Sequence, residues 1–148
     1  MKIGFLGTSL STHTATIIDS GNVRYYTTTR AQIGRAIASI LLKPTETANK
    51  YLFITSFITT QNQVVKACEE VTKEKFGLEH VSAEERLKEG KEMLAKGDFR
   101  GIGRLWNFWC HGEGRKKGVE EDLANELLEL PKENLEVVIR EALDEMKR

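Results

Sequence analysis

An aromatic cluster in the second half of the chain carries the side chains best suited to small-molecule chemistry. It contains Trp106, Phe108 and Trp109, followed directly by Cys110 and His111. Large aromatic rings supply much of the contact area in apolar binding sites, and histidine exchanges protons near neutral pH. One interpretation is a pocket in which the rings bind substrate and His111 acts as an acid or base. The alternative is ordinary core packing, with His111 at a helix end near backbone carbonyls.

Two adjacent tyrosines could add a hydrogen-bond donor to such a pocket. Tyr25 and Tyr26 fall in a run with β propensity, so their side chains are expected on opposite faces of a strand. Either one could therefore face a ligand, and the sequence does not choose between them. The candidate catalytic residues are His111, Tyr25 and Tyr26, and the candidate substrate-binding residues are Trp106, Phe108 and Trp109.

The glycines after the aromatic cluster imitate a phosphate-binding turn. Gly112, Gly114 and Gly118 follow an apolar stretch, but their spacing is GxGxxxG, whereas dinucleotide-binding turns use GxGxxG. The bulky aromatic residues before them also fit poorly under a phosphate group. We therefore expect a solvated basic loop here, containing the Arg-Lys-Lys run of residues 115–117, and no cofactor-binding residue.

Cysteines and histidines show no metal-ligand pattern. The histidines are His13, His80 and His111, and no two of them have the i, i+4 spacing that places ligands on one helix face. Cys68 and Cys110 lie far apart and form no CxxC motif. We expect no metal site and two reduced thiols, with Cys68 buried on the apolar face of its helix.

Composition excludes several classes of partner. The 148 residues suit one domain with a single core, so one domain is expected over residues 1–148, with residues 1–14 as a lead-in segment. The 22 basic residues balance 22 acidic ones, whereas a nucleic-acid-binding protein carries a basic face. No apolar run approaches the roughly 20 residues that cross a bilayer, and residues 3–10 are too short for a signal peptide. We expect a soluble cytoplasmic protein that binds neither nucleic acid nor membrane.

Short β-prone runs must position the tyrosines. Residues 14–18 and 23–27 are β-branched or aromatic, and residues 19–22 between them read Asp-Ser-Gly-Asn. Glycine and asparagine tolerate the positive φ of a tight turn, so the pattern predicts a β-hairpin. Residues 51–55 are mostly apolar and are expected to form a central strand covered on both faces. Residues 78–81 are expected to form a shorter strand.

Three capping boxes predict where helices begin. In this motif a Ser or Thr side chain bonds the backbone N–H three residues later, and the Glu or Gln there bonds back to the first N–H. The three pairs are Thr29 with Gln32, Thr60 with Gln63, and Ser82 with Glu85.

Helical spacing also predicts two apolar faces. The helix after Thr29 should end before Pro44, because the residue before a proline avoids the α region. The last helix is expected to begin at Pro131, in the favoured first position. Buried stripes are expected at Ile33, Ala36, Ile37, Ile40 and Leu41 in the former, and at Leu135, Val138, Ile139, Ala142, Leu143 and Met146 in the latter.

This order of elements resembles the C-terminal part of the NmrA-like and isoflavone-reductase-like proteins, which are atypical short-chain dehydrogenases. The most specific piece is TTTRAQIGRAIASILLKPTETANKYLFI at residues 27–54. Residues 112–143, which read GEGRKKGVEEDLANELLELPKENLEVVIREAL, are similar to the family's closing loop and last helices. One departure is Gln32, where the family usually has an acid.

The resemblance implies an α+β fold of about four strands and five helices, corresponding to the C-terminal part of an NmrA-like Rossmann-type fold. In that family the glycine-rich dinucleotide loop and the catalytic lysine belong to the N-terminal half. Only residues 1–14 precede the matching block, too few for a βαβ unit. The resemblance therefore implies a truncated relative of NADPH-dependent oxidoreductases, in which no cofactor is expected to bind.

Three functions are consistent with these observations. Secondary metabolism is the expected setting, and the first function is binding of a small hydrophobic or aromatic metabolite without a complete NAD(P) site. The second is a non-catalytic regulatory or assembly module that acts through a protein partner or a homodimer, paired at the exposed sheet edge near residues 51–55. The third is a cofactor-independent isomerase or cyclase that uses an aromatic-lined pocket.

Overall fold

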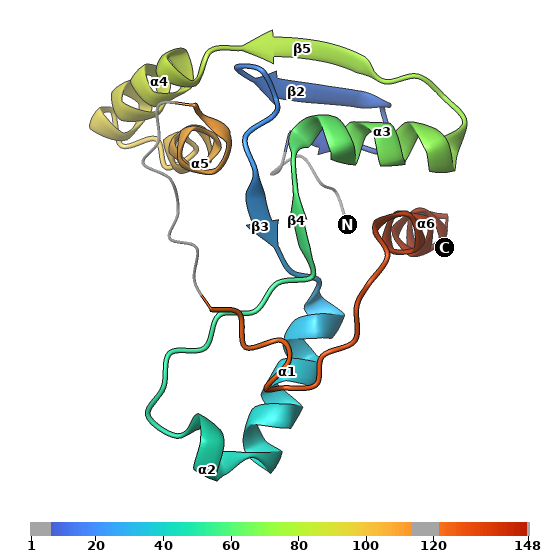
Figure 1. Cartoon of the computed structure of the whole chain (residues 1–148). Coiled ribbons are helices and arrows are strands. Elements are labelled where there is room, and N and C mark those ends of the chain that lie inside the picture. Colours follow the sequence, from blue (N-terminus) through green and yellow to red (C-terminus); the bar gives the residue numbers. More distant parts are fainter. Residues whose placement is uncertain (1–6, 114–121, 148) are drawn as a thin grey trace.

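Two small sheets form the β structure of the described part of the chain (Figure 1). The computed structural model describes residues 7–113 and 122–147. The strands are β1 (Thr8–Ser9), β2 (Thr14–Ile18), β3 (Tyr25–Thr27), β4 (Phe57–Thr59) and β5 (Gly77–Val81). One sheet has the order β1-β2-β5, in which β2 pairs antiparallel with β1 and parallel with β5. The other sheet is the antiparallel pair of β3 and β4.

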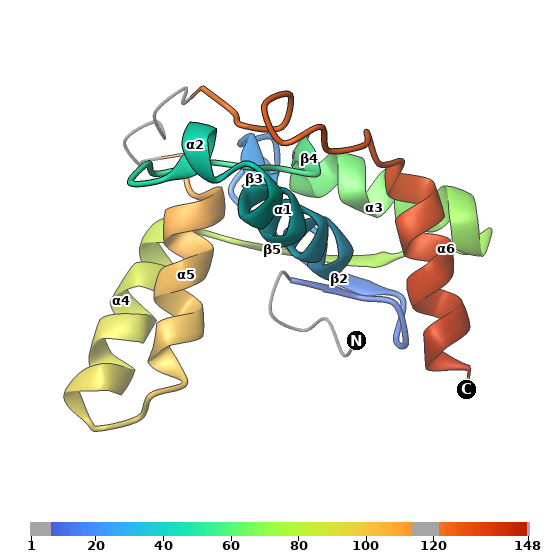
Figure 2. The same cartoon turned by 90° about the horizontal axis from the view of Figure 1, so that it is seen from below.

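Six helices accompany these strands in the described part of the chain. They are α1 (Arg30–Leu42), α2 (Pro44–Thr47), α3 (Gln61–Thr72), α4 (Ala83–Ala95), α5 (Gly101–His111) and α6 (Leu135–Met146). The α4–α5 pair and α6 lie at opposite ends of the molecule, with α1 between them (Figure 2). None of the described helices is long and apolar enough to cross a membrane. The mixture of helices and short strands confirms the expected α+β class.

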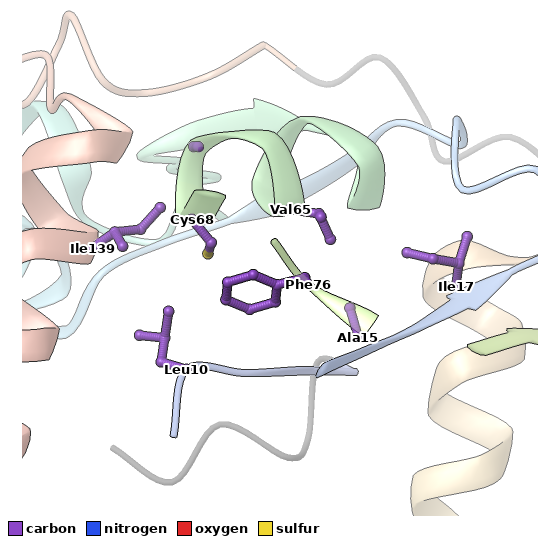
Figure 3. Close-up of a cluster of buried hydrophobic side chains, with 8 residues drawn as sticks. Leu10, Ala15, Ile17, Val65, Cys68, Phe76 and Ile139 are labelled. Atoms are coloured by element: carbon purple, nitrogen blue, oxygen red, sulfur yellow. The ribbon is translucent and has the colours of Figure 1, made fainter. Parts of the chain in front are cut away.

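The main hydrophobic core lies between β2, α3 and α6 (Figure 3). Ile17 of β2 is fully buried, and the same cluster includes Cys68 of α3 and Ile139 of α6. As the central strand of its sheet, β2 contributes Ala15 and Ile17 to this core. The members are Leu10, Ala15, Ile17, Val65, Ala67, Cys68, Phe76 and Ile139.

A second, smaller cluster attaches α1 to the segment that follows residue 122. Ala36 of α1 packs with Ala124 and Leu128, and Leu128 is only 1% exposed. The half-buried side chains of Ile40, Leu52, Ile54 and Leu130 surround these three.

Of the three predicted capping boxes, one forms completely and a second forms in part. The Thr60 hydroxyl accepts the Gln63 N–H at 3.2 Å, and the Gln63 side chain accepts the Thr60 N–H at 3.1 Å, which completes the capping box. The Thr29 hydroxyl likewise accepts the Gln32 N–H at 3.0 Å. The Gln32 side chain, however, donates to the Pro131 carbonyl at 2.9 Å instead of completing a box.

The third predicted cap is wrong, because the Ser82 side chain does not cap α4. Asp19 takes its place, and its Oδ1 accepts the Ala83 N–H at 2.8 Å. Its Oδ2 accepts the Glu113 N–H at 3.0 Å, just after α5. A carboxylate is a stronger acceptor at a helix N-terminus than a hydroxyl. One turn residue therefore fastens the start of α4 and the end of α5.

The predicted hairpin over residues 14–27 is also wrong, although both of its strands form. Gly21 has φ +68°, and its carbonyl accepts the Asn62 N–H at 3.2 Å. A Cβ at this glycine would lie 2.6 Å from the side chain of Ile17. The turn is thus packed against the start of α3, which directs β3 away from β2 and towards β4.

Burial is much lower than predicted in two other places. Of the expected α1 stripe only Ala36 is buried, whereas Ile37 is 55% exposed and Leu41 is 75% exposed. Residues 51–55 form no regular strand, and Phe53 makes one isolated bridge to Leu123. Apolar periodicity indicates a face that prefers to be covered, but it does not indicate that this chain covers it.

The last helix begins at Leu135 instead of Pro131. The Asn134 side chain caps it by accepting the N–H groups of Glu136 and Val137. The Pro131 carbonyl accepts a hydrogen bond from the Gln32 side chain, and residues 131–134 form no regular structure. Of the predicted glycine loop, Gly112 is described, and Gly114 and Gly118 lie outside the described residues.

Candidate functional site

A largely apolar pocket lies where α3, α6 and the ends of β1 and β3 meet. Its volume is about 310 Å³, near the lower end of the roughly 300–1,000 Å³ typical of small-molecule sites. The lining residues are Thr8, Leu10, Tyr25, Thr27, Thr28, Thr29, Arg30, Ala31, Phe57, Val64, Cys68, Leu135, Val138, Ile139, Glu141, Ala142 and Glu145.

The pocket has a buried apolar end and a charged mouth. Leu10, Cys68 and Ile139 are buried members of the main core (Figure 3) and also line the pocket. Arg30 and Glu141 are exposed and mark the side that opens to solvent. A ligand would therefore place its apolar body inside and its polar substituents towards the mouth.

Tyr25 is a buried polar side chain in the pocket wall. Burial raises the pKa of Tyr25 to about 12, and the thiols of Cys110 and Cys68 add to the rise. The phenol therefore keeps its proton at physiological pH and can act as a hydrogen-bond donor. Burial also raises the pKa of the Cys68 thiol to about 11, so this thiol is protonated and a poor nucleophile.

His111 lies directly behind Tyr25. The two rings meet edge to face, with centroids 4.5 Å apart and an interplanar angle of 82°. His111 is 1% exposed and is not among the lining residues, so it contacts the pocket through Tyr25. The structure thus brings together two of the three residues proposed from the sequence as catalytic.

The third candidate, Tyr26, faces the other way. It is 46% exposed and is not among the lining residues, as strand alternation after buried Tyr25 requires. Of the two tyrosines that the sequence left open, Tyr25 is the one at the pocket.

The aromatic cluster of α5 lies outside this pocket. Trp106 is 46% exposed, Trp109 is 60% exposed, and Phe108 meets Trp109 with ring centroids 5.6 Å apart. None of the three lines the pocket, and neither indole is packed in a closed core. Substrate contact by Trp106, Phe108 and Trp109 therefore stays a prediction. The apolar face of α6 packs on the main core through Ile139, as its spacing predicts. Sequence reasoning missed its second role, because Leu135, Val138, Ile139 and Ala142 also line the pocket.

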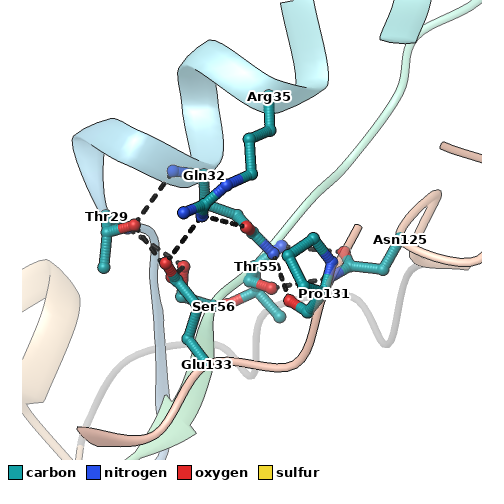
Figure 4. A network of polar contacts seen from close by, with 8 residues as sticks. All are labelled: Thr29, Gln32, Arg35, Thr55, Ser56, Asn125, Pro131 and Glu133. Carbon is teal, nitrogen blue, oxygen red and sulfur yellow. Dashed lines mark hydrogen bonds and ion pairs between the residues drawn. The ribbon is translucent and has the colours of Figure 1, made fainter. Parts of the chain in front are cut away.

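A polar network holds the chain that leads into this wall (Figure 4). Glu133 lies just before α6, and its carboxylate accepts hydrogen bonds from Thr29 at 2.8 Å and from Ser56. Arg35 donates to the other oxygen at 3.0 Å. Burial would raise the pKa of Glu133, but these hydrogen bonds and the charge of Arg35 hold it below its usual value. The network therefore fixes the start of α6 against α1 and β4.

The Asn125 side chain adds a second anchor to the same network. Its oxygen accepts the Thr55 N–H at 3.0 Å, and its amide donates to the Thr55 carbonyl at 2.7 Å.

No group of three or more His, Cys, Asp or Glu side chains is placed to hold a metal ion within residues 7–113 and 122–147.

The chain is similar in sequence to proteins named as oxidoreductases. It is 39% identical over 141 residues to the oxidoreductase aprR of Aspergillus flavus. This alignment covers 94% of this chain and 48% of aprR. It is 28% identical over 146 residues to the oxidoreductase poxI of Penicillium oxalicum, which covers 96% of this chain and 46% of poxI. The chain thus spans about half the length of the curated relatives it matches. No protein-family model matches the sequence.

A solved structure shares the fold. The structure described as AtPrR2 in apo form matches with a TM-score of 0.60 over 92% of this chain and 49% of that chain. The sequences are 20% identical, so the likeness concerns the fold alone.

Proposed function

We propose that this chain is the ligand-binding part of an oxidoreductase-related protein and that its pocket holds a small hydrophobic molecule. The observation that carries the proposal is the pocket itself, about 310 Å³, with an apolar interior and a protonated phenol in its wall. Sites for small molecules combine a mostly apolar lining with a few placed polar groups. The relation to aprR and poxI, both named oxidoreductases, supports a role in small-molecule metabolism.

The finer assignment to the NmrA-like and isoflavone-reductase-like group belongs to the same proposal. It is supported by residues 27–54, where the Thr29 cap, α1 and the turn after α2 follow in the family's order. Within this proposal, the described residues bind no NADPH. The pocket binds a metabolite from secondary metabolism.

Tyr25 and His111 have separate roles in this pocket. Tyr25 donates a hydrogen bond to an acceptor on the ligand, because its proton is retained at neutral pH. His111 is a positioning residue, because its ring packs against Tyr25 and is absent from the pocket lining. An isomerase or cyclase role would require the ligand's reacting atom to lie beside Tyr25.

The test uses 2-naphthol as a probe, since it combines an apolar two-ring body with one oxygen. Fluorescence titration is expected to show saturable binding to the wild-type protein. Val138→Trp should weaken binding at least tenfold, because Val138 lines the pocket and a larger side chain would fill it. Tyr25→Phe should weaken it by less, because one hydrogen bond contributes about 0.5–1.5 kcal/mol.

Val137→Trp is the matched control on the same helix. Val137 is 52% exposed and is not a lining residue, so this variant should bind the probe like the wild type. Circular dichroism would verify that both variants fold. Equal binding by Val138→Trp and the wild type would overturn the proposed site.

A further inference from the structure

Two glutamates of α6 are among the residues that line the pocket, on the side that opens to solvent. Glu141 and Glu145 are four residues apart, so they share one face of the helix, and both are exposed. Within residues 7–113 and 122–147, neither carboxylate forms an ion pair or a hydrogen bond through its side chain. Like charges at this spacing destabilise a helix slightly. Helix stability therefore does not account for the pair.

The end of α6 adds to the negative charge on this side of the pocket. Glu145 lies in the last turn of a helix that ends at Met146, and that turn contains no basic residue. The last carbonyl groups of a helix carry partial negative charge, which disfavours a carboxylate and favours a cation. Lys147 follows at the C-cap, but it is exposed and is not a lining residue. A positive group at the mouth would be attracted by both carboxylates and by the helix end.

Arg30 is the basic residue of the described lining, and its position does not balance this charge. It lies at the start of α1, where the helix dipole favours an acid. Glu133 already provides that acid, because its carboxylate accepts a hydrogen bond from the Thr29 cap at 2.8 Å. The lining residues therefore include two carboxylates and one guanidinium, and the favoured cation is missing only at the α6 side.

The buried wall of the pocket offers two hydroxyl groups. Thr8 and Tyr25 are each 7% exposed, and both line the pocket. Neither hydroxyl has a hydrogen-bond partner in the part of the chain that the structure describes, and neither oxygen is sealed from solvent. Buried polar groups normally have a partner. These two hydroxyls are therefore available to a molecule inside the pocket.

We propose that the pocket binds an organic cation, namely a protonated amine on an apolar ring system that carries a hydrogen-bond acceptor away from the amine. This inference rests on the pocket proposed above and names the class of molecule that it takes. The ammonium group lies beside Glu141 and Glu145, and the ring system contacts apolar lining residues such as Ile139. The acceptor receives the hydroxyl proton of Tyr25. The carboxylates thereby select amines over neutral and acidic molecules of the same shape.

Three fluorescent probes with the same ring system test this selection. They carry a 6-methoxynaphthalene body with an aminomethyl, a hydroxymethyl or a carboxylate group at position 2, and the methoxy oxygen is the acceptor. Titrations are made at pH 7 in about 0.15 M NaCl, where screening is physiological. The amine is expected to bind roughly fivefold or more tightly than the alcohol, since each exposed ion pair contributes up to about 1 kcal/mol. The carboxylate probe should bind most weakly.

Two double variants of α6 separate contact from general charge. Glu141→Gln combined with Glu145→Gln should remove the preference for the amine and leave the affinity for the alcohol unchanged. Glu136→Gln combined with Asp144→Asn is the control, because it removes the same charge from exposed positions of the same helix that do not line the pocket. This control should keep the preference for the amine. All four positions are exposed, so both proteins should keep the wild-type circular dichroism spectrum.

Three outcomes would overturn the cation proposal. These are equal affinity for amine and alcohol, an equal loss of amine binding in both double variants, and tightest binding by the carboxylate probe with a loss on Arg30→Gln. In each of these cases the pocket itself still stands if the alcohol binds saturably and Val138→Trp weakens it. If none of the three probes binds the folded wild-type protein, the pocket and the cation proposal both fail.

Discussion

At the scale of single residues, Gln32 shows why the sequence departs from the acid expected at this position. Its amide donates to the Pro131 carbonyl at 2.9 Å, while its oxygen accepts from Arg35 at 3.1 Å. An ionised acid has no N–H to give to the carbonyl, which would then lose this partner. The cap at Thr29 was predictable from local spacing, but the bond to Pro131 joins residues 99 positions apart and was not.

Glu133 is a largely buried carboxylate whose ionisation should contribute to stability. We expect Glu133→Gln to lower the free energy of unfolding at pH 7 by about 1–3 kcal/mol, because bonds to Thr29, Ser56 and Arg35 lose their charged acceptor. The folded-state pKa of Glu133 is lowered, so its contribution is present above the unfolded pKa of about 4.3 and is lost as pH falls further.

Urea unfolding at pH 7 and at pH 3 checks this prediction for Glu133. The difference in free energy of unfolding between the wild type and Glu133→Gln should be smaller at pH 3 than at pH 7. Glu126→Gln, at an exposed position, serves as the control and should change little at either pH. A difference of the same size at both pH values would show that the charge of Glu133 does not contribute.

At the scale of elements, the α4–α5 pair depends on two glycines. A Cβ at Gly101 would lie 2.5 Å from the Gly90 carbonyl oxygen and 3.0 Å from the Met93 Cβ. Gly101→Ala should therefore push the helices apart and destabilise the protein by roughly 1–3 kcal/mol.

Gly103→Ala is the matched control for this contact. It lies on the same helix, and a Cβ there would meet nothing within 4 Å. This change should be neutral or stabilising by up to roughly 1 kcal/mol, because alanine favours helix more than glycine does. Thermal denaturation followed by circular dichroism measures both variants, and equal effects would mean that the helices do not depend on this close approach.

The elements also show what local sequence can and cannot predict. The starts of α1 and α3 follow from Thr29 and Thr60, because a cap involves residues only three apart. The partners of β2 and β3 do not follow from sequence, because β2 pairs with β5 more than sixty residues away. Similarly, the pocket is lined by both α6 and β3, which are far apart in the sequence. No local sequence pattern predicts that these two elements lie side by side.

At the scale of the whole molecule, the described residues form two hydrophobic clusters of unequal size. The cluster around Ile17 contains eight buried residues, whereas the cluster that holds α1 contains three. The polar network around Glu133 joins the two regions (Figure 4). Local opening occurs where buried apolar contacts are few, so α1 is expected to open at lower free energy than α3.

Leu128→Ala tests that division. Leu128 is 1% exposed, and the change should weaken the α1 cluster by roughly 2–5 kcal/mol. In native-state hydrogen exchange the amides of α1 should then exchange faster, while those of α3 should keep their wild-type rates. Val65→Ala in the larger cluster is the reciprocal variant. It should speed amide exchange in α3, while the exchange rate of α1 should still be set by local opening of α1. If Leu128→Ala instead accelerates α1 and α3 equally, the two clusters unfold together and the exposed face of α1 belongs to a single cooperative unit.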